Sequence, residues 1–307
     1  MEYVILDCDP GHDDAVAIML LGKNKNIKLL GICVSSGNQI IAKTAKNAMF
    51  LVDYLDLDVP VAVGVSRPLV RKVEVCSEIH GESGLEGIEV KASKRKFAKL
   101  KSPNFMIEKI LNFPEKVTIV VTGPLTNLAL ALRLEPKICQ NIKKIVIMGG
   151  SYQMGNVSPA SEFNIQCDPE GASIVLDSGL PVYFVTLDVT RKVLCLPSII
   201  ERMDKIKNKA SALFVDLMRT FNSNQKKIFG YEGGPLHDPV TIATLIDPQL
   251  VTFKYVNTEI DLSHGPSYGR TNCDIFDYLH KEKNSFVSVD IDIQRFWDII
   301  EDGLRNY

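Results

Sequence analysis

Short runs of consecutive apolar residues alternate with longer segments in which apolar residues recur at helical spacing along most of the chain. Such runs are typical of strands buried on both faces of a sheet, and the longer segments predict helices that pack on it. The runs that we expect to form strands are residues 3–6, 27–35, 59–65, 116–121, 143–148, 181–187, 251–262, 269–276 and 285–291. Since strands and helices alternate, the sequence predicts an α/β protein with an open, mostly parallel (mixed) sheet and helices on both faces.

Helices are expected in the segments that separate or follow these runs. They comprise residues 15–21, 39–54, 102–112, 128–134, 168–178, 198–207, 210–222, 237–245 and 294–304. No stretch of altered composition marks a linker between them. We therefore expect a single domain over residues 1–307.

One polar segment, residues 151–167, breaks the alternation. In an extended segment, Glu162 and Asn164 point to the same side and Phe163 points to the other. A carboxylate and an amide on one side, with Asn156 nearby, are well suited to the hydroxyl groups of a sugar. A surface loop explains the same composition equally well.

Two further segments are expected to be loops. Residues 79–85 contain two glycines, small polar residues and His80, which suits a loop beside a site. Residues 225–236 contain three glycines and carry Phe229 and Tyr231. This second segment is expected to form a mobile flap over a pocket.

The composition is that of a globular protein, with 46% hydrophobic and 23% charged residues. The formal net charge of −2 provides no electrostatic case for nucleic acid or an anionic membrane as partner. The first residues show no signal-peptide pattern, and no later window holds 18 uninterrupted apolar residues, so we expect a cytoplasmic protein. Seven scattered cysteines without CxxC spacing indicate buried free thiols in a reducing compartment.

Four aspartates, Asp7, Asp9, Asp13 and Asp14, lie within eight positions at the first strand-to-helix turn. Carboxylates this close repel one another and raise each other's pKa unless a cation or several hydrogen-bond donors compensate them, and a divalent metal is the simplest compensation. Oxygen ligands favour calcium or magnesium over zinc. Helix capping explains Asp13 alone as well as metal binding does, but it does not explain all four aspartates.

Polar residues also follow other predicted strands. Asn38 lies in the turn after the second strand, at the edge where open α/β sheets bind ligands, although a plain turn asparagine is the alternative. The carbonyl group of Thr122 lies at a similar turn and can bind calcium. His237 and Asp238 follow the glycine-rich segment and form a second chemical signal.

The sequence resembles that of the nucleoside hydrolases, the inosine-uridine-preferring N-ribohydrolase family. Residues 7–15, DCDPGHDDA, match its DxDPGxDDA motif, and residues 155–164 match a GNxxPxxEFN-like run. The HGESGL stretch at residues 80–85 matches a third family segment. The resemblance covers the whole chain and implies the Rossmann-like nucleoside hydrolase fold.

The resemblance also implies a set of site residues. Calcium would be bound by Asp9, Asp14, the Thr122 carbonyl oxygen and Asp238. The ribose would be bound by Asp13, Asn38, Asn156, Glu162 and Asn164. Two histidines, His80 and His237, would lie beside the base, together with the flap residues Gln225, Phe229 and Tyr231.

The activity implied is calcium-dependent hydrolysis of the N-glycosidic bond of ribonucleosides in nucleoside salvage or catabolism. Cleavage passes through an oxocarbenium-like sugar, so a positioned water and nearby carboxylates are needed. Asp9 is the candidate general base and His237 the candidate acid. Gln225 and Phe229 resemble flap residues of pyrimidine-preferring members, which favours uridine and cytidine as substrates.

Other interpretations stay open at this point. Within the family, the alternative is a broad inosine-uridine hydrolase. A haloacid-dehalogenase-like phosphatase also carries DxD after its first strand, but residues 10–12 depart from its DxDxT/V pattern. A nucleoside-binding protein without catalysis is the third alternative. The resemblance further implies a homo-oligomer, either a dimer or a tetramer.

Overall fold

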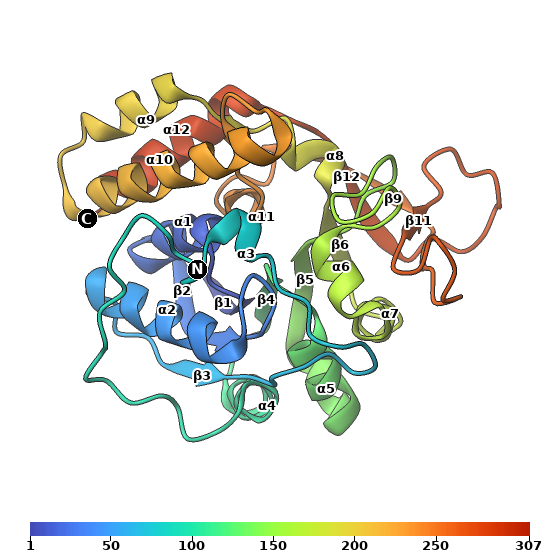
Figure 1. Cartoon of the computed structure of the whole chain (residues 1–307). Helices are drawn as coiled ribbons and strands as arrows, with labels where there is room; N and C mark the ends of the chain where they lie inside the picture. Colours follow the sequence, from blue (N-terminus) through green and yellow to red (C-terminus); the bar gives the residue numbers. More distant parts are fainter.

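The computed structural model describes residues 1–307, and its centre is an eight-stranded sheet in the order β3-β2-β1-β4-β5-β6-β12-β9 (Figure 1). The strands are β1 Glu2–Cys8, β2 Ile27–Val34, β3 Val61–Val63, β4 Val117–Val121, β5 Ile142–Met148, β6 Val182–Val185, β9 Val251–Val256 and β12 Ser285–Ile291. All neighbouring pairs are parallel except β9 with β12. The predicted α/β class with a mostly parallel, mixed sheet is confirmed.

Two apolar cores lie on the two faces of this sheet. The helices of the larger core are α1 His12–Gly22, α2 Ile41–Tyr54, α9 Pro197–Asp204, α10 Lys209–Phe229, α11 Asp238–Ile246 and α12 Ile293–Arg305. The helices of the smaller core are α4 Ser102–Asn112, α5 Thr126–Leu134 and α7 Pro169–Leu176. Figure 1 shows α9, α10 and α12 side by side above α1.

Helix α1 is buried on every side, from His12 to Leu21. It packs against α10, α11 and α12 as well as the sheet, which explains why its sequence is apolar all round and not amphipathic. Because α1 follows β1 directly, its first turn is fixed at the carboxyl edge of the sheet. Strand order reverses between β1 and β4, and open sheets of this kind bind ligands at such a point.

The short elements complete the chain. They are α3 Ser77–His80, η1 Pro136–Asn141, α6 Phe163–Cys167, α8 Leu187–Thr190 and two small antiparallel pairs, β7 Leu194–Cys195 with β8 Gly234–Pro235 and β10 Thr258–Ile260 with β11 Thr271–Cys273. The single strand expected over 251–262 is therefore two strands, and only the first joins the main sheet. No helix has both the length and the apolar character needed to cross a membrane.

The expectation of a loop beginning at residue 225 was wrong. Helix α10 continues to Phe229 because residues 222–229 contain neither glycine nor proline, and buried Asn224 and Gln225 hold its last turns in place. The helix ends at Gly230, whose φ of +74° gives the left-handed cap that glycine adopts most readily. Only the residues after Gly230 form a loop, so Gln225 and Phe229 are presented by a helix.

The extended segment expected over residues 162–164 ends at Glu162, because Phe163 and Asn164 belong to helix α6. Glu162 caps the N-terminus of α6, and its side chain accepts hydrogen bonds from the backbone N–H groups of Asn164 and Ile165. An acidic side chain at this position is favourable because the first N–H groups of a helix need acceptors. The prediction that Phe163 faces away from Glu162 and Asn164 was wrong as well, because all three line the same cavity.

Candidate active site

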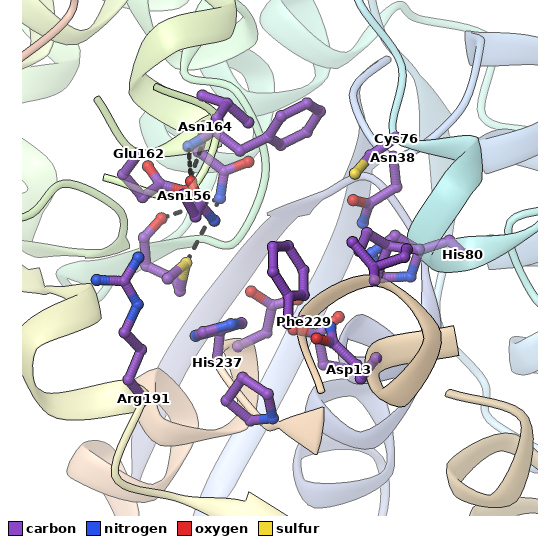
Figure 2. Close-up of a pocket in the computed structure, with 18 of the residues that line it drawn as sticks. Asp13, Asn38, Cys76, His80, Asn156, Glu162, Asn164, Arg191, Phe229 and His237 are labelled. Atoms are coloured by element: carbon purple, nitrogen blue, oxygen red, sulfur yellow. Dashed lines mark hydrogen bonds between the residues drawn. The ribbon is translucent and has the colours of Figure 1, made fainter. Parts of the chain in front are cut away.

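A cavity of about 500 Å³ opens at the carboxyl edge of the sheet, between the turns that follow β1, β2, β4 and β5 and the end of α10 (Figure 2). Predicted site residues that line it are Asp13, Asn38, His80, Thr122, Asn156, Glu162, Asn164, Gln225, Phe229, Tyr231, His237 and Asp238. Asp9 and Asp14 do not line it and are completely buried. The structure thus gathers side chains that are up to 225 positions apart in sequence, from Asp13 to Asp238.

Three carboxylates converge on one point in the structure. Asp13 and Asp14 lie in the first turn of α1, and Asp238 is the first residue of α11. Each offers an oxygen atom, and these atoms all lie within 4.8 Å of one another. This group includes Asp13, which the sequence analysis assigned to the ribose, and does not include Asp9.

Asp9 lies beside this group, at the end of β1. Its Oδ2 accepts a hydrogen bond of 2.6 Å from the backbone N–H of Asn38, but its Oδ1 is buried without a partner. The turns after β2 and β4 approach Asp9 closely, since a Cβ added to Gly37 or Gly123 would meet its carboxylate at 2.0 and 2.6 Å. A buried, unpaired carboxylate oxygen costs free energy unless a ligand completes it.

Asp14 connects the turns of the site. Its Oδ1 accepts from the Thr122 hydroxyl at 2.8 Å, and its Oδ2 accepts from the Gly11 N–H at 2.9 Å and from Asn38 Nδ2 at 3.0 Å. The Thr122 carbonyl in turn accepts from Asn164 Nδ2 at 2.9 Å. These bonds hold the turns after β1, β2 and β4 in one arrangement.

The electrostatics of the cluster favour a bound cation. Burial, followed by the charge of Asp14, raises the pKa of Asp13 from 3.8 to about 7 and raises the pKa of Asp9 well above its usual value. Burial and the charges of Asp13, Asp14 and Asp9 also raise the pKa of Asp238. All available donors are oxygens, and one is unpaired, so the residues fit a hard divalent cation.

The sugar side of the cavity carries three polar side chains that leave free groups (Figure 2). Asn156 Oδ1 accepts from the Phe163 N–H at 2.9 Å, so its amide nitrogen is free to donate. Asn164 Nδ2 donates to the carbonyls of Thr122 and Met148, so its Oδ1 is free to accept. Glu162 accepts from the backbone N–H groups of Gly150, Asn164 and Ile165 and still lines the cavity.

The opposite side is apolar and aromatic. His80 and Phe221 stack with ring centroids 5.9 Å apart, and Phe229 and Tyr231 lie at the mouth. Among these apolar groups, Gln225 Oε1 is buried and has no partner in the protein. The cavity therefore has carboxylates from Asp13 and Asp238, a polar wall, and an apolar wall with the free amide oxygen of Gln225. This arrangement suits a ribose attached to a flat base.

Comparison with known proteins agrees with this geometry. The sequence profile of the inosine-uridine preferring nucleoside hydrolases matches residues 4–298. The chain belongs to this family. The chain is a ribonucleoside hydrolase that acts on N-glycosyl bonds, and not a haloacid-dehalogenase-like phosphatase.

Individual relatives cover the chain almost completely. The pyrimidine-specific ribonucleoside hydrolase RihB of Shigella flexneri is 40% identical over 304 residues, which are 99% of this chain and 97% of that protein. A purine-preferring ribonucleoside hydrolase from Gardnerella vaginalis superimposes with a TM-score of 0.92 at 32% identity, covering 99% and 98% of the two chains. A plant nucleoside hydrolase gives 0.93 at 28% identity, with 99% of each chain covered.

This nucleoside hydrolase contains cavity residues that the sequence analysis missed. They are Cys76, Glu78, Ile79, Met148, Met154, Gly155, Val157, Phe163, Arg191, Phe221, Ile228 and Pro235. Met148 could have been found, because it ends a predicted strand at the same edge as Thr122. Most of the others come from segments whose position relative to the sheet has no signal in the sequence.

The one-turn helix α8 and Arg191 after it hold the loop of residues 152–156 in place. We call this segment, which carries Asn156, the sugar-side loop. Asp188 accepts from the N–H groups of Tyr152 and Gln153 at 2.9 and 3.1 Å. Arg191 donates to the carbonyls of Met154 and Gly155 at 2.7 and 2.5 Å. Four successive residues just before Asn156 are therefore bound through their backbone by α8 and the residue that follows it.

We expect Arg191→Ala to raise KM for nucleosides about tenfold with a smaller change in kcat, because the loop that carries Asn156 must then be ordered on binding. Initial rates over a range of nucleoside concentrations check this. Lys192→Ala is the matched control, since Lys192 pairs only with exposed Asp290 at the surface. Equal KM values for Arg191→Ala and the wild type would contradict the role of this contact.

The raised carboxyl pKa values predict an unusual pH dependence for this nucleoside hydrolase without cations. Asp13 ionises at its ordinary 3.8 when unfolded and at about 7 when folded, so the folded state holds an extra proton between these values. With chelator present, the free energy of unfolding should then fall as the pH rises from about 4 to 7. Thermal unfolding across this range checks the sign, and Asp13→Asn should reduce the slope. A rise in Tm with pH in chelator would contradict it.

Proposed function

We propose that this protein is a calcium-dependent, pyrimidine-preferring ribonucleoside hydrolase that releases ribose and a free base. The observation that supports it most directly is the unpaired, buried Oδ1 of Asp9 beside the group of Asp13, Asp14 and Asp238. Asp13 and Asp238 of this group line a cavity whose walls suit a sugar and a base, and Asp9 lies buried beneath its surface.

Asp9, Asp14, the Thr122 carbonyl and Asp238 would hold the calcium ion. A bound calcium ion supplies Lewis-acid chemistry there, since it lowers the pKa of a water molecule and attracts the oxygens of ribose hydroxyls. Asp13 lines the cavity, whereas Asp9 and Asp14 lie beneath its surface. We assign Asp13 to the sugar hydroxyls, together with Asn38, because it lines the cavity and is not one of the four proposed calcium ligands.

Asp9 accepts the proton of the attacking water as general base. The water adds to C1′ while the bond to the base breaks, and positive charge develops on the sugar. Glu162, which lines the cavity with Asn156 and Asn164, places negative charge near that sugar. The backbone donors to Glu162 fix its position, so little reorganisation is needed as charge develops.

His237 lines the cavity, and its Nδ1 is 2.7 Å from the Thr190 hydroxyl. Burial, followed by the charge of Arg191, lowers the pKa of His237 to about 3. It is therefore neutral in the free protein at neutral pH. We assign it to the departing base as a donor, with Thr190 fixing the orientation of its ring.

Gln225 supports the preference for pyrimidines. Its free Oε1 lies among apolar side chains, where an unpaired polar atom favours a ligand with a complementary edge. Uracil and cytosine present donors and acceptors in opposite orders, and a side-chain amide can serve either by rotating about its last bond. The 40% identity to pyrimidine-specific RihB points the same way.

A reducing-sugar assay over uridine, cytidine, inosine, adenosine and their 2′-deoxy analogues tests this function, with and without chelator. We expect release from uridine and cytidine to exceed release from the purine nucleosides, and the 2′-deoxy analogues and the chelated enzyme to be slow. Equal rates with inosine would favour the broad inosine-uridine alternative. Activity that ignores both chelation and the 2′-hydroxyl would contradict the proposed site.

The remaining properties follow as proposals. The odd number of scattered cysteines suits a reducing compartment, so we place the enzyme in the cytoplasm, in nucleoside salvage or catabolism. We propose one domain over residues 1–307, assembled as a homodimer or homotetramer. Light scattering on the purified protein measures the assembly, and a monomeric mass would contradict it.

A further inference from the structure

The hairpin of β10 and β11 lies outside the main sheet and contacts the polar segment of residues 151–162 at two places. Thr271, the first residue of β11, bonds to Ser151 at the start of that segment. In the turn before β11, the carbonyl of Tyr268 accepts a hydrogen bond of 2.8 Å from the Ser161 hydroxyl. Figure 1 shows β11 at the end of the sheet where β9 lies. The hairpin therefore holds the segment that carries sugar-side residues near both of its ends.

Thr271 binds both backbone groups of Ser151. Its hydroxyl accepts from the Ser151 N–H at 2.8 Å and donates to the Ser151 carbonyl at 2.8 Å. One hydroxyl can do both, because it has one donor and two acceptor lone pairs. Each of the two residues is only 2% exposed, so water has little access to these groups. The hydroxyl of Thr271 thus fixes the backbone of a residue 120 positions away in the sequence.

Gly150, just before Ser151, connects this contact to the sugar side of the cavity. The N–H of Gly150 donates to Glu162 Oε2 at 3.0 Å. Its φ is +76°, and a Cβ added to it would meet Thr271 Cγ2 at 2.8 Å. Thr271 therefore packs directly on Gly150 while it bonds to Ser151. Because glycine has few preferred conformations of its own, the direction of the Gly150 N–H depends on such contacts.

Gly150 is the donor that ties Glu162 to the main sheet. The other two donors to Glu162, the N–H groups of Asn164 and Ile165, belong to α6, whose N-terminus Glu162 caps. Burial raises the pKa of the Glu162 carboxyl, whereas the three N–H groups and the charge of Arg191 oppose this change. The bond from Gly150 thus both places the carboxylate and favours its charged form.

We propose that Thr271 is a positioning residue for Glu162, which it reaches through the backbone of Gly150 and Ser151. The proposal rests on the proposed function and specifies what holds the negative charge of Glu162 near the sugar. Thr271 does not line the cavity, so it acts only through the groups that it contacts. Figure 2 shows Glu162 on the same side of the cavity as Asn156.

Kinetics of Thr271→Val test this role, since valine keeps the shape of threonine but lacks the hydroxyl. Both backbone groups of Ser151 then lose their partner, and the Gly150 N–H is no longer held toward Glu162. We expect kcat/KM for uridine to fall about tenfold, as expected for loss of one hydrogen bond to a charged group. Most of the fall should be in kcat, because Glu162 acts on charge that develops in the transition state.

Two matched variants separate the hydroxyl of Thr271 from the stability of the hairpin. Thr271→Ser keeps the hydroxyl and should stay within about threefold of the wild-type kcat/KM. Thr258→Val removes a hydroxyl from the neighbouring strand β10, where Thr258 accepts from the Ser285 hydroxyl at 2.7 Å. It should leave kcat/KM unchanged. If Thr271→Val does not fold, Thr271→Cys, whose thiol bonds only weakly, makes the same comparison.

A double-mutant cycle shows whether Thr271 acts through Glu162. When Glu162→Gln has already removed the charge, adding Thr271→Val should lower kcat/KM by less than about twofold. Gln225 lies on the opposite wall and shares no hydrogen-bond partner with Glu162. Adding Thr271→Val to Gln225→Ala should therefore still lower kcat/KM about tenfold.

Carbon-13 NMR of the full-length protein, labelled at the glutamate carboxyl carbons and loaded with calcium, provides a measurement that needs no activity. Glu162→Gln identifies the Glu162 signal. We expect the pKa of Glu162 to be higher in Thr271→Val than in the wild type, because a donor to the charged form is lost. The same pKa should be unchanged in Thr258→Val.

The proposed function and the role of Thr271 fail in different ways. If the wild type hydrolyses no nucleoside, the proposed function is wrong, and the pKa of Glu162 in Thr271→Val then decides whether Thr271 positions it. If the wild type is active, three results would each overturn the role of Thr271. They are a normal kcat/KM in folded Thr271→Val, an equal loss in Thr271→Ser, and a full tenfold loss in the Glu162→Gln background.

Discussion

Replacing Asp9 by asparagine is expected to lower kcat by about 1,000-fold while the fold stays intact. Asparagine keeps the Oδ acceptor for the Asn38 N–H but removes the negative charge that accepts a proton from water. Loss of a general base costs about 10²- to 10⁴-fold, and Asp9 is also assigned to the cation. Ribose release from uridine at saturating substrate and calcium measures the effect.

Asp7→Asn is the matched control for Asp9→Asn. Asp7 lies two residues earlier on the same strand, is equally buried, and accepts from Asn127 Nδ2 at 2.9 Å. Burial raises its pKa to about 8, so at neutral pH it is largely protonated and asparagine resembles it closely. We expect near-normal kcat in this variant. Near-normal kcat in Asp9→Asn would rule out its role as base.

Chelation of divalent cations is expected to reduce ribose release to below about 1% of the untreated rate, and added calcium should restore it. Without a cation, the raised pKa values of Asp9 and Asp238 leave these buried groups protonated or in mutual repulsion. Asp9 is then a poor acceptor for the proton of water. Rates in calcium-buffered solutions with and without chelator measure this loss.

The variant Asp238→Asn tests whether Asp238 is one of the calcium ligands. It removes one carboxylate from the group formed with Asp13 and Asp14 and keeps an oxygen donor at the same place. The calcium concentration that gives half-maximal activity should rise at least tenfold, with partial recovery at high calcium. Exposed Asp290, which pairs only with Lys192, is the position for a control substitution to asparagine. An unchanged calcium dependence in Asp238→Asn would remove Asp238 from the site.

Local sequence patterns were sufficient to predict most strands and helices of the fold. Continuous apolar runs such as residues 117–121 and 142–148 became buried parallel strands, since only strands covered on both faces tolerate such runs. The DxDPGxDDA motif marked the edge of the sheet where the cavity opens. The family was therefore correctly identified before any geometry was known.

Errors arose where the local pattern and the packing disagreed. Gln225 belongs to a glycine-rich stretch by composition, but its amide is buried against the fold at the end of α10. Glu162 belongs to a polar segment, but it caps α6 through the N–H groups of Asn164 and Ile165 and also accepts from the distant Gly150 N–H. Burial against distant residues keeps Gln225 in the helix, and a helix cap fixes Glu162; neither contact leaves a periodic signal in the sequence.

The sequence by itself determined the α/β class, the order of most strands and helices, the membership of the family and the acidic motif, because each depends on residues close together in the chain. Only the tertiary structure decided that Asp13, Asp14 and Asp238 meet, that Asp9 Oδ1 lacks a partner, that α8 holds the sugar-side loop and that Thr271 binds Ser151. These features depend on how distant turns converge at one edge of the sheet. That convergence follows from the packing of whole helices and strands, and no single segment encodes it.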